Sequence, residues 1–258
     1  MPAELVSTSQ GKTLVLTVRH PELRNAFDPA IFAAGIEALS VAERSDEVRS
    51  VVITGADGGF SAGADLQRLL AGNHEGAQAQ AQAVESLHNW IETIRTYPKP
   101  VIAAVEGTAA GAGFSLALAC DLIVAARNAS FVMAYSQIGL SPDGGVTWSL
   151  GRALPRQLAS EILLCGERME PARLHALGLV NRVVEPGQAL QEAMALAQTL
   201  NERAPNALDS IKELLSEAPH NTLTAQLASE RDHFVRNLHH PNAREGIAAF
   251  LEKRSPRY

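Results

Sequence analysis

The chain has 258 residues, of which 46% are hydrophobic, 19% are charged and 5% are aromatic. This composition suits a globular protein large enough to bury a core, and it excludes a disordered, collagen-like or disulfide-stapled chain. The 28 Asp and Glu residues outnumber the 22 Lys and Arg residues, which gives a formal net charge of −6. Because nucleic-acid-binding proteins usually carry a basic excess or a basic stripe, we expect no nucleic-acid partner.

No stretch of the sequence has the pattern of a targeting or membrane segment. The first residues lack the basic-then-apolar order of a secretory leader, and no apolar run approaches the ~18 residues that suggest a membrane span. The two cysteines, Cys120 and Cys165, lie in apolar stretches outside any C-x-x-C pair, so we expect both to be reduced and buried. These patterns predict a cytoplasmic protein with no membrane association.

The first predicted elements are a hairpin, a helix and a strand. Residues 14–18 are rich in strand formers and follow Gln10-Gly11-Lys12, which predicts an N-terminal hairpin. Asp28-Pro29 is a helix start, with an acidic N-cap and proline at the first helical position, and apolar spacing carries this helix to about Ala42. Residues 50–55 form a short apolar run, as in a strand covered on both faces.

The next segment, residues 67–83, is rich in Ala and Gln. This composition predicts a poorly anchored helical segment, and we expect it to be mobile. A further helix runs through residues 90–94 and is ended by Pro98 and Pro100, which interrupt helical hydrogen bonding.

The middle of the chain alternates between strands and helices, and its end is helical. The predicted elements are strands at 100–105, 121–126 and from 130, a helix at 114–119, a turn at 141–145 followed by a helix, a strand at 179–184, and helices from 187 onward. Short apolar strands separated by helical crossovers indicate parallel βαβ units.

Two Gly- and Ala-rich loops, at residues 58–65 and 107–113, share one design. Each follows a buried strand and leads into a helix. Small side chains let a ligand approach backbone N–H groups, and a helix N-terminus adds free donors. Two such loops facing each other would form an oxyanion hole that stabilises a developing enolate. The same residues could also serve only as tight turns and close packing surfaces.

Two common motifs fit the second loop poorly. Gly111-x-Gly113 after a strand suggests a dinucleotide-binding fingerprint, but Leu116 stands at the third glycine position and no acid follows at the required distance. Residues 113–117 read G-F-S-L-A, so they lack the last glycine of a nucleophile elbow. His175 and His233 are available as downstream histidines, but nothing around them supports a serine hydrolase.

Eight segments, in this order and spacing, resemble the crotonase superfamily, the enoyl-CoA hydratase/isomerase family. They are R-N-A-F (24–27), F-S-A-G-A-D-L (60–66), K-P-V-I-A-A-V-E-G (99–107), G-A-G (111–113), A-C-D-L-I (119–123), I-G-L-S-P-D-G-G (138–145), A-L-G-L-V-N (176–181) and E-G-I-A-A-F-L-E-K-R (245–254). The resemblance covers nearly the whole chain.

The resemblance implies an α/β fold of the crotonase (ClpP-like) type. Residues 1–195 would form a spiral of ββα units, and residues 196–258 a C-terminal helical region used in trimerisation. It further implies a homotrimer or dimer of trimers, a coenzyme A thioester as substrate, no metal, and no cofactor other than the coenzyme A that the substrate carries.

The resemblance also assigns site residues. The backbone N–H groups of Ala62 and Ala112 would hold the thioester oxygen, and Phe250 and Lys253 would reach the coenzyme A of a neighbouring subunit. Arg24 and Lys253 would meet its phosphates. The full set implied to contact coenzyme A is Arg24, Ala62, Gly63, Ala64, Asp65, Leu66, Gly111, Tyr135, Phe250 and Lys253.

The sequence departs from the family's hydratases at both of their paired glutamates, where it carries Ser115 and Tyr135. The remaining candidate is Asp143. Alone, Pro-Asp-Gly is a turn-forming triplet, but family isomerases linked to phenylacetate breakdown carry an acid in this context. The resemblance therefore implies Asp143 as a single acid/base that removes a proton and returns it elsewhere, with Ala62 and Ala112 stabilising the enolate.

Several activities stay open at this point. The principal expectation is double-bond isomerisation or hydration of an enoyl-CoA in fatty-acid or phenylacetate-type catabolism. Hydrolytic ring opening of an oxepin-CoA-type thioester and a non-catalytic CoA-binding role are alternatives. A nucleophilic aspartate, as in aryl-CoA dehalogenases, is weakened by Tyr135, since those relatives carry Trp nearby.

Overall fold

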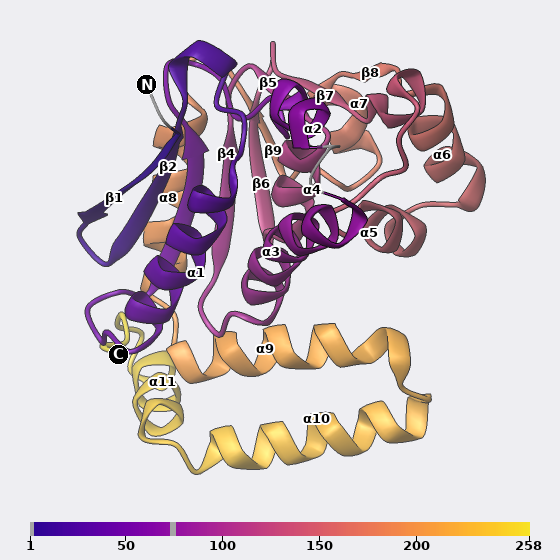
Figure 1. Cartoon of the computed structure of the whole chain (residues 1–258). Helices are drawn as coiled ribbons and strands as arrows, with labels where there is room; N and C mark the ends of the chain where they lie inside the picture. The colour runs from indigo at the N-terminus through magenta and orange to yellow at the C-terminus, as the bar shows by residue number, and fades with distance from the viewer. Residues whose placement is uncertain (1–2, 73–75) are drawn as a thin grey trace.

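The computed structural model describes residues 3–72 and 76–258 of the chain, which form one six-stranded sheet, one three-stranded sheet and the helices around them (Figure 1). The strands are β1 (Glu4–Gln10), β2 (Thr13–Arg19), β3 (Ser50–Gly55), β4 (Val101–Val105), β5 (Thr108–Ala110), β6 (Leu122–Ala126), β7 (Ser130–Val132), β8 (Arg168–Met169) and β9 (Arg182–Val184). The large sheet has the order β1-β2-β3-β4-β6-β9, with β1 antiparallel to β2 and the other neighbours parallel. The parallel βαβ prediction is confirmed.

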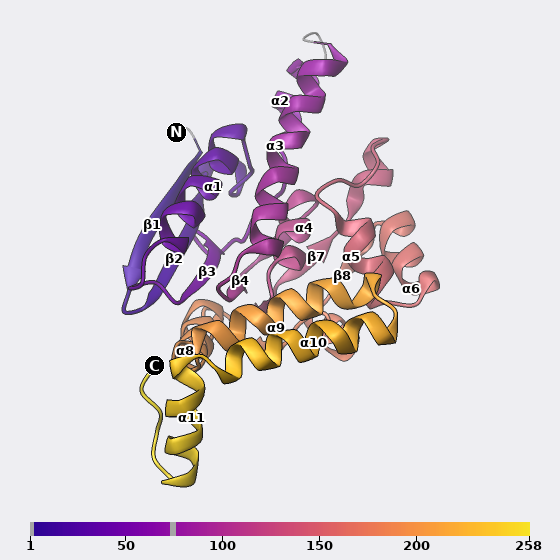
Figure 2. The same cartoon turned by 90° about the horizontal axis from the view of Figure 1, so that it is seen from below.

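The helices lie on both sides of this sheet and below it (Figures 1 and 2). They are α1 (Pro29–Glu43), α2 (Leu66–Gly72), α3 (Ala77–Thr96), α4 (Ala112–Ala119), α5 (Val146–Ala153), α6 (Arg156–Ser160), α7 (Pro171–Ala176), α8 (Ala189–Asn201), α9 (Pro205–Glu217), α10 (Leu223–Leu238) and α11 (Pro241–Leu251). Short helical turns are η1 (Pro21–Leu23), η3 (Ala134–Ile138), η4 (Glu161–Cys165) and η5 (Ala218–His220).

The central strands are apolar throughout because both faces of the sheet are covered, as predicted. Alternate residues point to opposite faces. On β3, Val52 packs toward α8, whereas Ile53 packs with the core formed by α1, α3 and α4. Helix α8 meets the sheet through Ala189, Ala193 and Ala197, which are fully buried and small enough for close approach.

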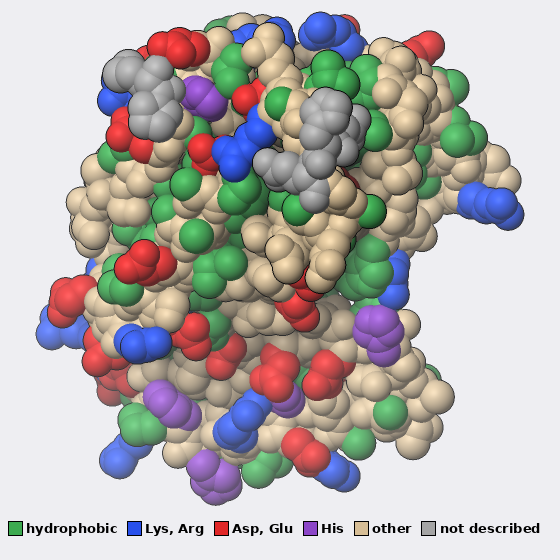
Figure 3. Space-filling view, viewed as in Figure 1, with side chains coloured by type: hydrophobic (Ala, Val, Ile, Leu, Met, Phe, Trp, Pro, Cys, Tyr) green, Lys and Arg blue, Asp and Glu red, His purple; other side chains and the backbone are tan. Residues whose placement is uncertain are grey.

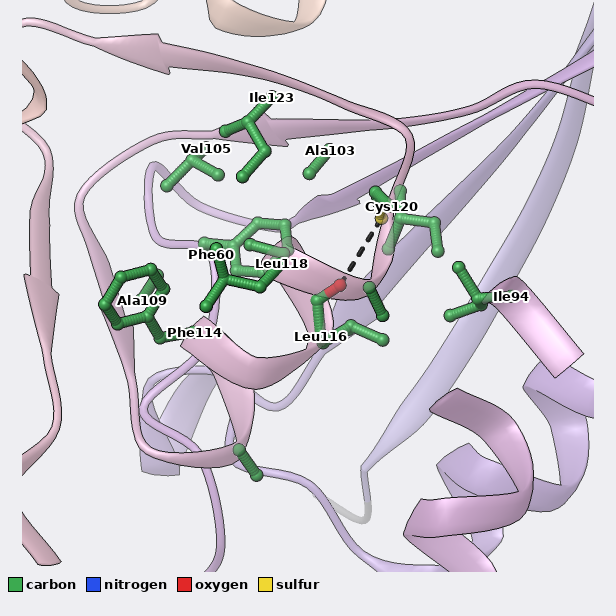
Figure 4. Packing of buried hydrophobic residues seen from close by; sticks show 14 of the residues in the cluster. Phe60, Ile94, Ala103, Val105, Ala109, Phe114, Leu116, Leu118, Cys120 and Ile123 are labelled. Atoms are coloured by element: carbon green, nitrogen blue, oxygen red, sulfur yellow. Dashed lines mark hydrogen bonds between the residues drawn. The ribbon is translucent and has the colours of Figure 1, made fainter. Parts of the chain in front are cut away.

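Helix α4 is buried on all sides in the middle of the larger core (Figure 4). Beside it, Cys120 is buried and its Sγ donates to the Leu116 carbonyl at 3.4 Å. Burial raises the pKa of this thiol, so it stays protonated, as expected of a packing residue. Cys165 is exposed. The prediction that it is buried is wrong, because it lies at the end of η4 next to Leu164, whose side chain is also exposed.

Several predicted boundaries agree with the structure. The N-terminal hairpin is β1–β2, and the Asp28 side chain caps α1 by accepting from the Ile31 N–H at 3.1 Å. Within residues 67–83, α2 and the start of α3 are helical, while residues 73–75 lie outside the described residues. The mobility of this segment stays a prediction.

Two local predictions are corrected. The strand expected at 179–184 begins only at Arg182, since the N–H groups of Leu179 and Val180 donate to the Leu174 carbonyl and close a turn after α7. The loop at 107–113 contains β5, which pairs with β7 in the small β5-β7-β8 sheet. The strand predicted from residue 130 is β7, but the patterns did not predict β5, β8 or the second sheet, because these strands have only two or three residues.

The C-terminal helices form a hairpin, α9–α10, that lies beneath the core, followed by α11 (Figures 1 and 2). The predicted boundary between residues 195 and 196 falls inside α8, which belongs to the core, so the helical extension begins at α9. Lys212 on α9 joins the two parts, with its Nζ 2.5 Å from Asp121 Oδ2. Exposed apolar side chains of the extension are Ile211, Leu215, Leu223, Leu227, Phe234, Val235, Leu238, Ile247, Phe250 and Leu251.

Candidate active site

The two glycine-rich loops meet beside the N-terminus of α4, as predicted. Ser61 and Ala109 form a bridge in which the Ala110 N–H donates to the Ser61 carbonyl at 2.9 Å. Gly63, with φ of +86°, comes so close to the second loop that a Cβ there would lie 2.5 Å from the Ala110 carbonyl oxygen. Only glycine fits this position, both for its conformation and for the space available.

The structure changes the expected donor in the first loop. The Ala62 N–H donates to the Arg24 carbonyl at 3.0 Å, so it is already engaged and the prediction of Ala62 as an oxyanion donor does not fit. In the second loop the Gly111 N–H donates to the Val132 carbonyl. Ala64 and Ala112 both line one cavity, and neither N–H donates to another group within the described residues. These two amides are the free pair.

The cavity has a volume of about 250 Å³ and lies between α1, α2 and α3 and the two loops. Phe27 and Phe32 contribute aromatic surface to it and pack with each other and with Trp90 at ring-centroid distances of 5.8 to 6.1 Å. Leu87 from α3 adds an aliphatic wall, and Asp143 is also in the lining. A cavity with apolar walls and few polar groups is the usual form of a small-molecule site.

Three carboxylates line this cavity, and two of them are occupied by helix capping. Asp28 caps α1, and Asp65 Oδ1 accepts from the N–H groups of Gln67 and Arg68 at the start of α2. Asp143 caps no helix. Its Oδ1 accepts from Tyr135 Oη at 2.5 Å, and its Oδ2 has no hydrogen-bond partner among the described residues. Asp28 and Asp65 likewise use only Oδ1, so what distinguishes Asp143 among the three is that its carboxylate caps no helix.

Tyr135 and Ser115, at the two hydratase glutamate positions, both hold the Asp143 segment. Burial, and next the charge of Asp143, raises the pKa of Tyr135, so its phenol stays protonated and donates to Asp143. Ser115 Oγ donates to the Asp143 backbone carbonyl at 3.0 Å. A Cβ on Gly144 would lie 2.7 Å from the Ser115 Cβ, so the aspartate loop rests directly on this serine.

The remaining predicted residues fall into two groups. Arg24 and Leu66 are exposed beside the loops, and Gly111 gives the second loop its shape, since a Cβ there would lie 3.3 Å from Tyr135 Oη. Phe250 lies on α11 and is 83% exposed, and Lys253 follows this helix. Helix α11 lies at the opposite end of the molecule from α2 (Figures 1 and 2). Within one chain these two residues do not line the cavity.

Sequence reasoning missed the cavity roles of Asp28 and Arg68. Asp28 was identified only as a helix cap, and no pattern indicated that the start of α1 faces the start of α2 across a cavity. The bond between Tyr135 and Asp143 was also missed, because the turn geometry between the two residues is not encoded in any spacing rule.

The surface charge, the possible metal ligands and the apolar helices of the described residues indicate no further site. On the face seen in Figure 3, Lys and Arg side chains are interspersed with Asp and Glu outside the grey atoms. In residues 3–72 and 76–258, no group of three or more His, Cys, Asp and Glu residues is placed to hold a metal ion. None of the helices described for this chain is long and apolar enough to cross a membrane.

Comparison with known proteins identifies the family. A family profile described as "Enoyl-CoA hydratase/isomerase" matches residues 8–258. The chain is 38% identical to a 1,2-epoxyphenylacetyl-CoA isomerase of Escherichia coli (98% of this chain, 97% of the relative) and 39% identical to a putative enoyl-CoA hydratase of Thermus thermophilus (98% and 100%). An enoyl-CoA hydratase structure from Polaromonas is 66% identical, with a TM-score of 0.98 over 98% of this chain and 99% of that one. The chain thus belongs to the enoyl-CoA hydratase/isomerase family, has the crotonase fold and is an enzyme of that class.

Proposed function

We propose that the enzyme isomerises an acyl-CoA thioester, with Asp143 as its only acid/base. The observation that carries this proposal is the placement of the three cavity carboxylates: Asp28 and Asp65 cap helices, whereas Asp143 caps none and its segment is held by Tyr135 and by Ser115 of α4. A single carboxylate next to a pair of free N–H groups suits removal and return of one proton.

The proposed chemistry starts at the carbon next to the thioester carbonyl. Asp143 Oδ2 removes a proton there, and the electron pair of the C–H bond moves to the carbonyl oxygen as an enolate. The N–H groups of Ala64 and Ala112 donate to this oxygen, and Ala112 adds the partial positive charge of the N-terminus of α4. For a 3-enoyl thioester the proton then returns to C4, and the double bond shifts to the C2–C3 position.

Hydration is less well supported by this arrangement. Addition of water needs a group that positions and deprotonates the water as well as one that protonates carbon. Here the two residues at the hydratase glutamate positions, Ser115 and Tyr135, are already bonded to the Asp143 segment. The name of the E. coli relative, an isomerase of an epoxide-bearing aryl thioester, also supports isomerisation in phenylacetate-type catabolism.

We further propose that the enzyme works as a homotrimer or a dimer of trimers. The exposed apolar side chains of α9, α10 and α11 would be covered by neighbouring subunits. In that assembly Phe250 and Lys253, exposed on one chain, would reach the coenzyme A bound to another, and Arg24 would contribute a second cation near its phosphates.

The test is a panel of three substrates: 3-hexenoyl-CoA for isomerisation, crotonyl-CoA for hydration and an oxepin-type CoA for ring opening. We expect isomerisation to exceed both hydration and ring opening. Faster hydration or ring opening would contradict the proposed reaction. Asp143→Asn should abolish the main activity, whereas Asp232→Asn, an exposed acid on α10, should not change it.

A further inference from the structure

The charges around the acyl cavity are unbalanced. Among the described lining residues, Asp28, Asp65 and Asp143 are acidic and Arg68 is the one cation. Three carboxylates against one guanidinium leave two net negative charges. The N-termini of α1, α2 and α4 lie at the cavity and offset roughly half a charge each, which still leaves a negative cavity.

Arg68 is poorly placed to act as a receptor for an added anion. Its side chain is 60% exposed, so solvent screens its charge, and its Nη1 already lies 4.0 Å from Asp28 Oδ2. The Asp28 side chain is only 19% exposed. Its charge is therefore less screened than that of Arg68. An anion that approached the guanidinium would also approach this carboxylate.

The rest of the described lining offers little to an anion. It is dominated by Phe27, Phe32, Val84, Leu87 and small alanines, and Gln80 contributes the one neutral side-chain amide. A carboxylate that enters such a cavity loses hydration without gaining a charged partner, which is costly. A neutral hydrocarbon chain or ring loses nothing comparable and buries apolar surface.

From this charge distribution we infer the substrate class: the enzyme takes thioesters with neutral, apolar acyl groups and rejects those whose acyl chain ends in a carboxylate. The inference rests on the proposed function, since it treats this cavity as the acyl site. It makes Asp28 a specificity-determining residue, in addition to its role as the cap of α1.

The experiment compares binding of hexanoyl-CoA and adipyl-CoA by calorimetry. Both thioesters are saturated, contain coenzyme A and have six acyl carbons. The ratio of their dissociation constants therefore measures the effect of the terminal carboxylate on binding. We expect adipyl-CoA to bind about tenfold more weakly, a ratio that corresponds to roughly 1.4 kcal/mol. Adipyl-CoA binding as tightly as hexanoyl-CoA, or more tightly, would overturn the inference. If neither thioester bound, the proposed function itself would fall.

Three variants sharpen this test. Asp28→Asn removes one charge but keeps a side chain that caps helices as well as Asp does, so α1 should stay folded. The ratio of the adipyl-CoA to the hexanoyl-CoA dissociation constant should fall by a factor of about three. Arg68→Gln removes the cation and should raise this ratio, because adipyl-CoA would bind still more weakly. Asp232→Asn, away from the cavity, should leave the ratio as it is. An unchanged ratio in Asp28→Asn would contradict the assigned role of Asp28.

Discussion

The core and the C-terminal helices bury their apolar residues in opposite ways. In the core, β4 and α4 are buried along their whole length. In α9, α10 and α11, the buried residues are Ser210, His233 and Ala249, and most of the large apolar side chains are exposed. The core therefore obtains its stability within one chain, whereas the helical extension needs a second chain to cover it. The proposed chemistry belongs to the first region and the proposed assembly to the second.

The largest expected effect is on the chemistry of the core. Asp143→Asn should lower kcat/KM for the best substrate by about a thousandfold, because acid/base catalysis by a placed side chain contributes this much. The side chain is isosteric and caps no helix, so the thermal midpoint should stay near that of the wild type. Steady-state kinetics with thermal unfolding checks both points. Full activity in this variant would remove Asp143 from the mechanism.

The second effect compares packing in the two regions. Ile53→Ala in the fully buried part of β3 should lower the free energy of unfolding by about 3 kcal/mol, through lost burial and a cavity. Leu215→Ala on α9, which is 69% exposed, should change it by less than about 0.5 kcal/mol in dilute, dissociated protein. Denaturant titration measures both. Equal losses would mean that Leu215 is covered within its own chain.

The third effect concerns assembly. Phe234→Asp on α10 places a charge on the exposed apolar surface and should shift the protein toward monomers in sedimentation velocity experiments. Val41→Asp is the matched control, because Val41 is similarly exposed but lies on α1 of the core. We expect this control to keep the wild-type assembly. Dissociation by the control alone would place the subunit contact on the core instead.

The fourth effect concerns the link between the regions. Burial raises the pKa of Asp121, and Lys212 acts against that shift. Lys212→Met would leave the partly buried Asp121 carboxylate without its cation and should cost about 2 kcal/mol of stability. Arg231→Met, which removes an exposed ion pair with Asp232 on α10, should cost little. If both variants unfolded alike, the Lys212 bridge would not anchor α9.

The smallest effect is a pH dependence of the core. Burial, with a contribution from the charge of Glu43, raises the pKa of Tyr97, whose Oη donates to the Leu39 carbonyl. The folded state therefore keeps this proton after the unfolded state begins to lose it near pH 10, and stability falls as pH rises above that value. Tyr97→Phe should be less stable at pH 8 by about 1 kcal/mol but should decline less steeply between pH 10 and 11. Parallel slopes would contradict this assignment.

Much of the fold could be predicted because its signals are local. The apolar runs of β3 and β4 reflect burial on both faces, and the Asp28-Pro29 start of α1 reflects capping chemistry. The strand predicted from residue 130 is β7, but β5 and β8 of the second sheet escaped prediction, since two or three residues carry no periodicity. The exposure of Cys165 escaped it too, because an apolar neighbourhood in sequence does not show which side of a turn faces solvent.

The sequence predicted the two loops of the site and its acid, Asp143, but it did not predict the hydrogen bonds between them. Ala62 and Ala64 are both small residues of one loop, and only the three-dimensional hydrogen bonding shows that the Ala62 N–H is engaged by Arg24. In the same way, the pairing of Tyr135 with Asp143 and the approach of Arg68 to Asp28 join segments whose relative placement depends on packing of the whole chain.

The role of Asp143 as the single acid/base is tested most directly by proton exchange on an unreactive substrate. Phenylacetyl-CoA has protons next to its carbonyl but no double bond to move, so incubation in deuterium oxide reports enolate formation alone. Mass spectrometry should show deuterium incorporation at that carbon with the wild-type enzyme and none above background with Asp143→Asn. Equal incorporation by both proteins, or none by the wild type, would contradict the one-carboxylate mechanism.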